Sequence, residues 1–191
     1  MSPRTKQQFE DIRKSRKESL VNAALHLFAH KGIQSTSISD IANSAGVSKG
    51  LLYNYFKDKN ELIREIIING LTEMMAELNF NAQNDLTKES FVDLINKNFE
   101  MLKNQSNNIR LYIAVLTQPS VAEIVKDEIF KIFKPMIQNI AAYYLEKGVK
   151  DPLIYGLLIG AILDGISIDY MFFPEQYPLD EIRDLIIEKF V

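Results

Sequence analysis

Apolar residues recur at helical spacing along nearly the whole chain. Leu20, Ala24, Leu27 and Phe28 share one face and predict a first helix over residues 10–30. No stretch keeps the period-two alternation of a strand, so the sequence predicts an all-α protein of about nine helices. The other expected helices are a short one after Ser37 and those over residues 49–56, 59–79, 87–104, 107–117, 120–147, 152–173 and 178–190.

Turn and cap residues separate the first of these helices. Gly32 suits the left-handed position that ends a helix. Ser37 with Asp40 three residues later has the spacing of a capping box. Gly46 permits a turn with positive φ, and Ser48 caps the helix that follows it. Two short helices joined by a glycine turn, with a third ahead of them, form a helix-turn-helix.

The second short helix has two chemically different sides. At about 100° per residue, four residues fall on one arc and four on the opposite arc. The first arc holds Lys49, Gly50, Tyr53 and Asn54, and the second holds Leu51, Leu52, Tyr55 and Phe56. The first side therefore offers a cation, an open backbone and hydrogen-bonding groups, while the second is expected to pack inward. Core aromatics with solubilising lysines are the structural alternative.

This arrangement predicts a reader of duplex DNA, because the second helix of such a pair enters the major groove. Lys49, Tyr53 and Asn54 are the candidates for contacts to base edges. Free amides at helix N-termini attract phosphates, and such contacts fix register. The candidates for phosphate contacts are Thr36, Ser37 and Ser48 at helix starts, and Lys59 at the start of the fourth helix.

Charge is divided unevenly along the chain. Residues 1–60 carry ten Lys or Arg and five Asp or Glu, hence +5, whereas residues 61–191 carry twelve and twenty, hence −8. A basic head favours a polyanionic partner, although chance and a solvated basic segment give the same balance. The chain has no cysteine, which excludes disulfides and thiolate sites. Its polar N-terminus predicts a cytoplasmic protein.

Residues 153–173 form an apolar run that is long enough to cross a bilayer. Asp164 and Asp169 inside it, and the lack of a flanking Lys/Arg cluster, argue against a membrane span. Small residues at spacings of four let helices approach closely, so we predict a homodimer through the last two helices, with an intrachain core as the alternative. The candidate interface residues are Gly156, Gly160, Asp164, Ile182, Leu185 and Ile186.

The middle helices are rich in aromatic residues and methionine, which line adaptable apolar pockets and also fill ordinary cores. We expect a small effector of largely apolar or aromatic character. Its candidate pocket residues are Met74, Phe91, Phe99, Tyr112, Phe133, Met136 and Tyr143. Pro135 is expected to kink or split the helix over residues 120–147, because proline lacks an amide donor.

Signals of catalysis are weak. His26 and His30 have the i, i+4 spacing that can chelate a metal, but HLFAH lacks the glutamate of the HExxH zinc motif. No glycine-rich phosphate loop follows a strand, and no nucleophile elbow is present. We therefore expect no enzyme activity, no metal and no cofactor.

The segment GIQSTSISDIANSAGVSKGLLYNYFKDKNEL, residues 32–62, resembles the DNA-binding domain of the TetR family of bacterial transcriptional regulators. The matching positions are Gly32, Thr36, Ile41, Ala42, Ala45, Gly46, Val47, Ser48, Gly50, Leu52, Tyr53, Tyr55, Phe56, Lys59, Glu61 and Leu62. Tyr55 stands where the family most often has a histidine that helps bind a phosphate, whereas the helical periodicity turns Tyr55 partly inward.

The resemblance implies a helix-turn-helix domain over residues 1–58 and a helical ligand-binding and dimerisation domain over residues 59–191. It implies a homodimer on palindromic operator DNA, usually a repressor that releases the operator when a small molecule binds. A ligand-independent, architectural DNA-binding dimer is the alternative.

Overall fold

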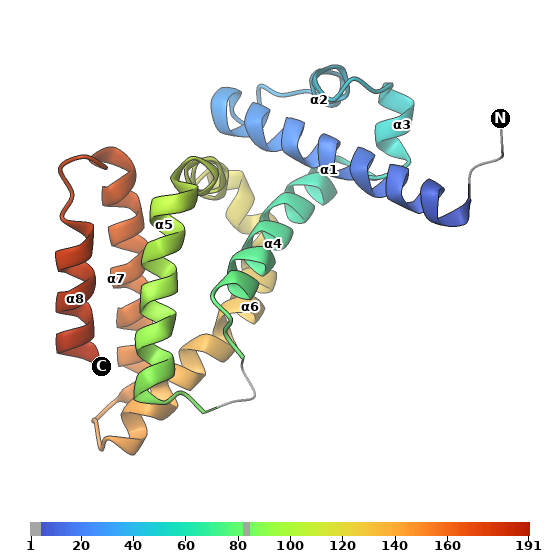
Figure 1. Ribbon diagram of the computed structural model, residues 1–191. Coiled ribbons are helices and arrows are strands. Elements are labelled where there is room, and N and C mark those ends of the chain that lie inside the picture. The colour runs from blue at the N-terminus through green and yellow to red at the C-terminus, as the bar shows by residue number, and fades with distance from the viewer. Residues whose placement is uncertain (1–4, 82–84) are drawn as a thin grey trace. The chain divides into compact units, whose positions relative to one another are not determined.

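The structure is a computed structural model that describes residues 5–81 and 85–191. Within those residues the chain forms eight helices and no strand, which confirms the all-α prediction (Figure 1). The helices are α1 (Lys6–Lys31), α2 (Ile38–Ser44), α3 (Lys49–Tyr53), α4 (Lys59–Glu77), α5 (Lys88–Leu116), α6 (Pro119–Glu146), α7 (Pro152–Phe172) and α8 (Leu179–Phe190).

The count is eight rather than about nine because two expected helices form one kinked helix. Gln105 in the middle of α5 has φ −125° and ψ 20°, outside the helical region. This kink falls in the polar stretch where the sequence predicts a break. Pro135 lies inside α6, which continues through it rather than splitting. Proline removes one amide donor, and the remaining hydrogen bonds of a long helix keep it continuous.

The helix α3 is shorter than the predicted range 49–56. The amides of Tyr55 and Phe56 both donate to the carbonyl of Leu52, at 2.9 and 3.0 Å, so the chain tightens into a turn after Tyr53. This turn carries the Phe56 side chain into the core, where it is 1% exposed. The early end of α3 thus keeps the apolar side buried without extending the helix.

The chain divides into two compact units. The first contains the described residues up to Gly70 together with Leu111–Lys126. Its core is built from fully buried side chains on α1 to α4: Leu20, Phe28, Ile41, Leu52, Leu62, Ile63 and Ile66. The start of α4 and the segment joining α5 to α6 therefore belong to the same body as the helix-turn-helix. The functional boundary between residues 58 and 59 stays a prediction.

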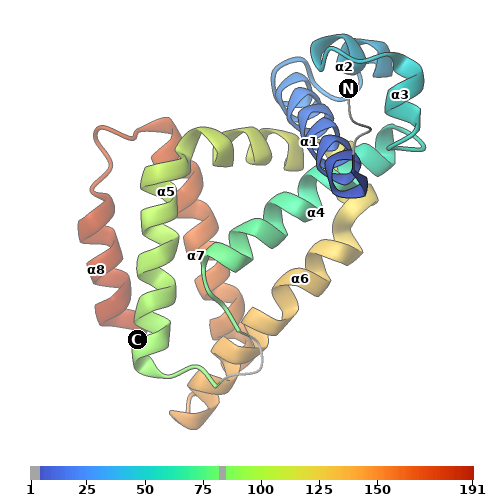
Figure 2. The same ribbon diagram turned by 45° about the vertical axis from the view of Figure 1, so that its right-hand side comes forward.

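The second unit contains Leu71–Arg110 and Asp127–Val191. In it the first part of α5 lies beside α7 and α8 (Figures 1 and 2). Aromatic side chains from α5 and α6 interlock in its core. The rings of Phe91 and Tyr143 form a T-shaped pair with their centres 5.2 Å apart, and those of Tyr143 and Tyr144 form another with their centres 5.5 Å apart. The Tyr144 hydroxyl donates to the carbonyl of Phe190, which fixes the end of α8 against α6.

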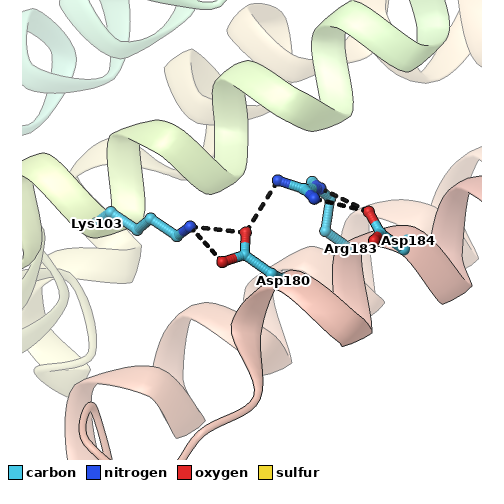
Figure 3. Close-up of polar contacts among 4 residues, drawn as sticks. All are labelled: Lys103, Asp180, Arg183 and Asp184. Atoms are coloured by element: carbon cyan, nitrogen blue, oxygen red, sulfur yellow. Dashed lines mark hydrogen bonds and ion pairs between the residues drawn. The ribbon is translucent and has the colours of Figure 1, made fainter.

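Charged side chains hold the outer surface of α8 to α5 (Figure 3). Lys103 on α5 reaches both oxygens of Asp180 on α8, at 2.6 and 2.7 Å, and Arg183 reaches Asp180 and Asp184. The hydrogen bond from Lys103 is the main reason that the pKa of Asp180 lies below its usual value. Exposed ion pairs contribute about 0–1 kcal/mol each, so the buried Leu179 and Ile186 stabilise this contact more.

The helix α7 is strongly apolar, yet it is mostly exposed. Among the described residues it is the one helix long and apolar enough to span a membrane, and only 17% of its most apolar 18-residue stretch is buried. Six of the exposed apolar residues share one side of the helix. They are Leu153, Ile154, Leu157, Leu158, Ile168 and Phe172, here named the α7 stripe. A core helix of this chain alone would not expose so much apolar surface.

Candidate nucleic-acid interface

The helix-turn-helix has the caps and the turn that the sequence predicts. Ser37 accepts a hydrogen bond from the amide of Asp40 at 3.1 Å, and the Asp40 carboxylate accepts one from the Ser37 amide at 2.8 Å. Gly46 has φ 67°, in the region that favours glycine. Ser48 accepts from the amide of Leu51 at 3.2 Å and so starts α3. These local bonds fix α2 and α3 as two separate short helices.

The two sides of α3 face opposite surroundings. Leu52 and Phe56 are 0% and 1% exposed, so the apolar side is clamped in the core. On the other side Lys49, Gly50 and Asn54 are exposed, and Tyr53 is 48% exposed. The predicted division of this helix into a buried and an open side is confirmed. We name Ser48, Lys49, Gly50, Tyr53 and Asn54 the α3 face.

Gly50 keeps the middle of the α3 face flat. A Cβ added at Gly50 would meet no heavy atom of the protein within 4 Å, so packing within the chain does not require glycine there. Glycine costs a helix roughly 1 kcal/mol relative to alanine. The missing side chain leaves the backbone of α3 open at this position.

Tyr55 lies between the two sides, as the periodicity predicts. It is half-buried, with its ring tilted against Phe56 at 6.4 Å. The guanidinium of Arg13 on α1 lies 5.9 Å from the centre of the Tyr55 ring, within the range of a cation–π contact. Arg13 is exposed, so α1 adds a cation close to α3 that the motif alone does not reveal.

Thr36 is not available to a phosphate, which corrects the prediction for this residue. Its side chain is 1% exposed, and its hydroxyl donates to the carbonyl of Gly32 at 2.8 Å. The carbonyl of Leu27 is a second, longer partner at 3.4 Å. Thr36 therefore closes the loop after α1 instead of facing outward.

Ser37 is exposed, but a carboxylate already occupies the start of α2. The Ser37 hydroxyl and amide both donate to the same Asp40 oxygen at 2.8 Å. Both hydrogen bonds hold the pKa of Asp40 below its usual value, and the bond from the Ser37 backbone amide has the larger effect. A phosphate at this helix start would have to share the site with that negative charge. The phosphate contact of Ser37 stays a prediction.

Lys59 has a structural role that the sequence did not predict. Its ammonium donates to the carbonyls of Ile33 at 2.8 Å and Thr36 at 3.1 Å. The side chain is half-buried, so α4 begins by holding the loop that precedes α2. Two of the three N–H groups of the ammonium are bound in this way, and the phosphate contact of Lys59 stays a prediction.

Replacing Lys59 with methionine tests whether this side chain serves the loop or a phosphate. The loss of two charge-assisted hydrogen bonds is expected to lower the free energy of unfolding by about 1–3 kcal/mol. The dependence of DNA affinity on salt should not change, since each phosphate contact adds about 0.9 to the slope of log K against log salt. Chemical unfolding and DNA titrations at several salt concentrations measure both quantities. A slope that falls by about one, with unchanged stability, would restore the phosphate role.

Most of the predicted pocket residues are packed in or against the core of the second unit. Phe91, Phe99 and Tyr143 are 0%, 1% and 5% exposed in the packed aromatic core of the second unit. Met74 and Met136 pack against that core, and Phe133 is partly buried. The remaining candidate, Tyr112, belongs to the first unit.

Tyr112 packs against the backbone of α4 within the first unit. A Cβ on Gly70 would come within 2.3 Å of a Tyr112 ring atom, so the ring fits only because residue 70 is glycine. A hollow of about 300 Å³ in the second unit lies around Leu78, Leu86 and Leu94 and touches none of the predicted pocket residues. The effector pocket stays a prediction.

The predicted interface residues separate into two groups. Gly156 is buried, and a Cβ there would lie 2.7 Å from the carbonyl oxygen of Ile137, so this glycine serves packing of α7 on α6. Ile186 is 5% exposed within the chain. The prediction that Gly156 and Ile186 lie in the dimer interface is therefore wrong, because α6 and the core of the second unit cover them within one chain.

The other interface candidates remain accessible. Leu185 is 53% exposed, Asp164 is exposed, and Gly160 and Ile182 are partly buried. Sequence reasoning did not single out the α7 stripe residue by residue, although it flagged the apolar run that contains them. Their exposure makes α7 the centre of the candidate interface.

One further residue was missed by sequence reasoning. Gln118, at the joint of α5 and α6, donates to the carbonyl of Phe28 at 3.0 Å and accepts from the amide of Ile33 at 2.8 Å. A glutamine in a polar joint carries no periodic signal that would reveal such contacts. It thus ties a segment far along the chain to the end of α1.

Comparison with known proteins shows what this arrangement is similar to. Residues 20–66 match the bacterial regulatory proteins of the tetR family. The chain is 41% identical over 66 residues to the HTH-type transcriptional regulator AcrR of Shigella flexneri. It is 26% identical over 140 residues to the HTH-type transcriptional repressor KstR2 of Rhodococcus jostii. These matches cover 35% and 71% of this chain, but only 29% and 66% of the two relatives, less than two thirds of either.

The likeness extends over the whole fold. The transcriptional regulator FadR of Bacillus subtilis, in a crystal structure with stearoyl-CoA, has a TM-score of 0.73 and is 19% identical. That alignment covers 91% of this chain and 97% of the solved chain. The described residues therefore share the all-helical fold of that solved chain.

Proposed function

We propose that this chain binds a palindromic operator as a homodimer and represses transcription. The premise is that the chain belongs to the TetR family of DNA-binding transcriptional regulators, which are not enzymes. The observation that carries the proposal is the α3 face, which stays open while Leu52 and Phe56 anchor the helix from behind. Recognition helices of this class read base edges in the major groove. Regulation of genes by such a protein takes place in the cytoplasm.

Base recognition is assigned to three residues of the α3 face. Lys49 supplies a cation suited to guanine, Asn54 an amide suited to adenine, and Tyr53 a hydroxyl with an apolar ring. Gly50 lets the backbone of α3 approach the groove. Ser48 stands at the start of the helix, where a phosphate is bound most readily.

Dimerisation through α7 supports this reading of DNA. The α7 stripe presents exposed leucine, isoleucine and phenylalanine along one side of a 21-residue helix, beside the exposed Leu185 of α8. Burial of such a surface against a second copy would give a large apolar interface, as obligate dimers have. A two-fold axis would then place two α3 faces about 34–36 Å apart, or a multiple of that.

Asp164 gives this region a dependence on pH. Although Asp164 as a residue is exposed, desolvation of its carboxyl raises the pKa above the usual 3.8, so the folded protein disfavours the charged form. Stability is therefore lost as the pH rises through the interval between 3.8 and the raised value. Asp164→Asn is expected to increase resistance to urea at neutral pH, and the gain should vanish as the pH approaches 3.8. An equal gain at both pH values would contradict this cause.

The effector is proposed to be a molecule with a long apolar chain, of which a long-chain acyl thioester is the first to test. Support comes from the stearoyl-CoA bound to the similar FadR and from the adaptable Met74 and Met136 beside the second core. The side-chain oxygen of Asn98 on α5 is buried without a hydrogen-bond partner, which an entering polar group would supply. Binding would release DNA only if the effector prefers the released state.

Selection of DNA from a random duplex pool tests the proposed function. The wild-type protein is expected to enrich a palindrome whose half-sites are spaced as the two-fold axis requires. Acyl-CoA thioesters of increasing chain length, with free CoA as the control, are then added to the complex. Higher thermal stability and release of the duplex support an acyl effector. Enrichment without any response would leave the ligand-independent DNA-binding dimer as the better description.

A further inference from the structure

The loop between α1 and α2 is held by side chains from two distant parts of the chain. Its first residues, Gly32 and Ile33, follow the end of α1, and Ser37 caps α2 at its other end. Lys59 binds the carbonyls of Ile33 and Thr36, as described above. The amide of Ile33 donates to the side-chain oxygen of Gln118 at 2.8 Å. The position of this loop sets where α2 begins.

Both polar atoms of the Gln118 carboxamide have hydrogen-bond partners. Its oxygen accepts from Ile33, while its nitrogen donates to the carbonyls of Phe28 at 3.0 Å and Ala114 at 3.1 Å. Both N–H groups of the amide are therefore used. The side chain is half-buried. Only an amide combines an acceptor with two donors in this geometry, and asparagine is one methylene too short.

These bonds join the helix-turn-helix to the segment Leu111–Lys126, here named the α5–α6 corner. All of the residues concerned lie in the first compact unit. Arg64 on α4 adds a second link to the same corner, because its guanidinium donates to the carbonyl of Ile124 at 3.1 Å. The corner thus contacts both α1 and α4, the two helices between which α2 and α3 are inserted in the chain.

We propose that Gln118 is a positioning residue for DNA recognition: its carboxamide fixes the α1–α2 loop, and through it α2 and the α3 face, to the α5–α6 corner. This inference rests on the proposed DNA-binding function. Gln118 lies outside the α3 face and acts only through Phe28 and Ile33. A shift of the loop would tilt α3 while leaving Lys49, Tyr53 and Asn54 in place on their helix.

Such a tilt should affect sequence recognition more than general attraction to DNA. Hydrogen bonds to base edges require donor–acceptor distances of about 2.7–3.2 Å and good angles. Attraction to phosphates depends mainly on charge, which Gln118 does not carry. A variant that merely unfolds part of the protein would lower both kinds of binding together. The ratio of operator to non-operator affinity therefore separates positioning from simple destabilisation.

Gln118→Met and Gln118→Glu test the proposal. Methionine keeps the length and loses all three hydrogen bonds, whereas glutamate keeps an acceptor but faces two carbonyls with a charge. Thr117→Val is the matched control, because Thr117 is exposed just after the end of α5 and its hydroxyl donates to the carbonyl of Ile113, four residues earlier, at 2.8 Å. The probes are the duplex that wild-type protein selects from a random pool and a scrambled duplex of equal length.

Both Gln118 variants are expected to bind the selected duplex about tenfold more weakly, equivalent to about 1.4 kcal/mol. The affinity of the uncharged Gln118→Met variant for the scrambled duplex should stay within about twofold of wild type, as should both affinities of Thr117→Val. If Gln118→Met does not fold, Gln118→Asn provides the same comparison. Unchanged operator affinity, or a parallel loss on both duplexes, overturns the positioning role alone. If the wild-type protein selects no sequence, the proposed function fails, and this inference fails with it.

Discussion

Simultaneous replacement of Lys49, Tyr53 and Asn54 by alanine is expected to lower operator affinity by at least about a hundredfold. Each good contact to a base edge contributes about 1–3 kcal/mol of discrimination, and 1.4 kcal/mol is a factor of ten. The loss should be much smaller on non-operator DNA, where only the charge of Lys49 matters. Fluorescence anisotropy with the selected and scrambled duplexes measures both affinities.

The fold should survive this change, because all three side chains are exposed and the core contacts of α3 come from Leu52 and Phe56. Surface substitutions of this kind alter stability by about 0.5 kcal/mol or less. Lys126→Ala on α6 is the control for the loss of one exposed cation in the same unit. A triple variant that is folded and binds the operator as tightly as the control would remove the α3 face from the recognition surface.

Leu157→Glu is expected to convert the dimer into a folded monomer. Leu157 is 53% exposed within one chain and lies in the α7 stripe, so the substitution adds little strain to the monomer but buries a charge in the dimer. Loss of the dimer separates the two α3 faces, so operator affinity is expected to fall. Linked binding of two sites contributes about 10²–10⁴ in affinity. Sedimentation equilibrium and DNA titration report the two effects.

Leu145→Glu is the matched control, because Leu145 on α6 is 64% exposed and lies outside the α7 stripe. This variant should remain dimeric and bind the operator like wild type. A dimeric Leu157→Glu protein would place the interface elsewhere. A wild-type protein that sediments as a monomer and binds neutral lipid vesicles would instead assign α7 to a membrane.

Much of the first unit follows from local sequence chemistry. Gly46 and the hydroxyls of Ser37 and Ser48 specify turns and caps by themselves, so the three helices around them were predictable. Periodicity also identified the open side of α3, because residues on one arc of a helix share an environment. The same rule located the C-terminal helices, but it predicted two separate helices where α5 is one kinked helix.

The remaining assignments depended on contacts between distant residues. Thr36 and Lys59 match a familiar motif, but the structure shows that both bind backbone carbonyls of one loop. Gln118 lies 85 residues from its partner Ile33, a separation that no local pattern encodes. Three of the aromatic residues offered for a pocket, Phe91, Phe99 and Tyr143, fill the second core, since burial and pocket lining use the same side chains. Sequence spacing alone does not separate these outcomes.

The central claim is that the α3 face reads base edges, and the structure of the protein bound to its selected duplex tests it most directly. The account predicts α3 of each subunit in the major groove, with Lys49, Tyr53 and Asn54 within hydrogen-bonding or van der Waals distance of bases. A complex in which α3 points away from the duplex, while another surface contacts the DNA, would contradict it.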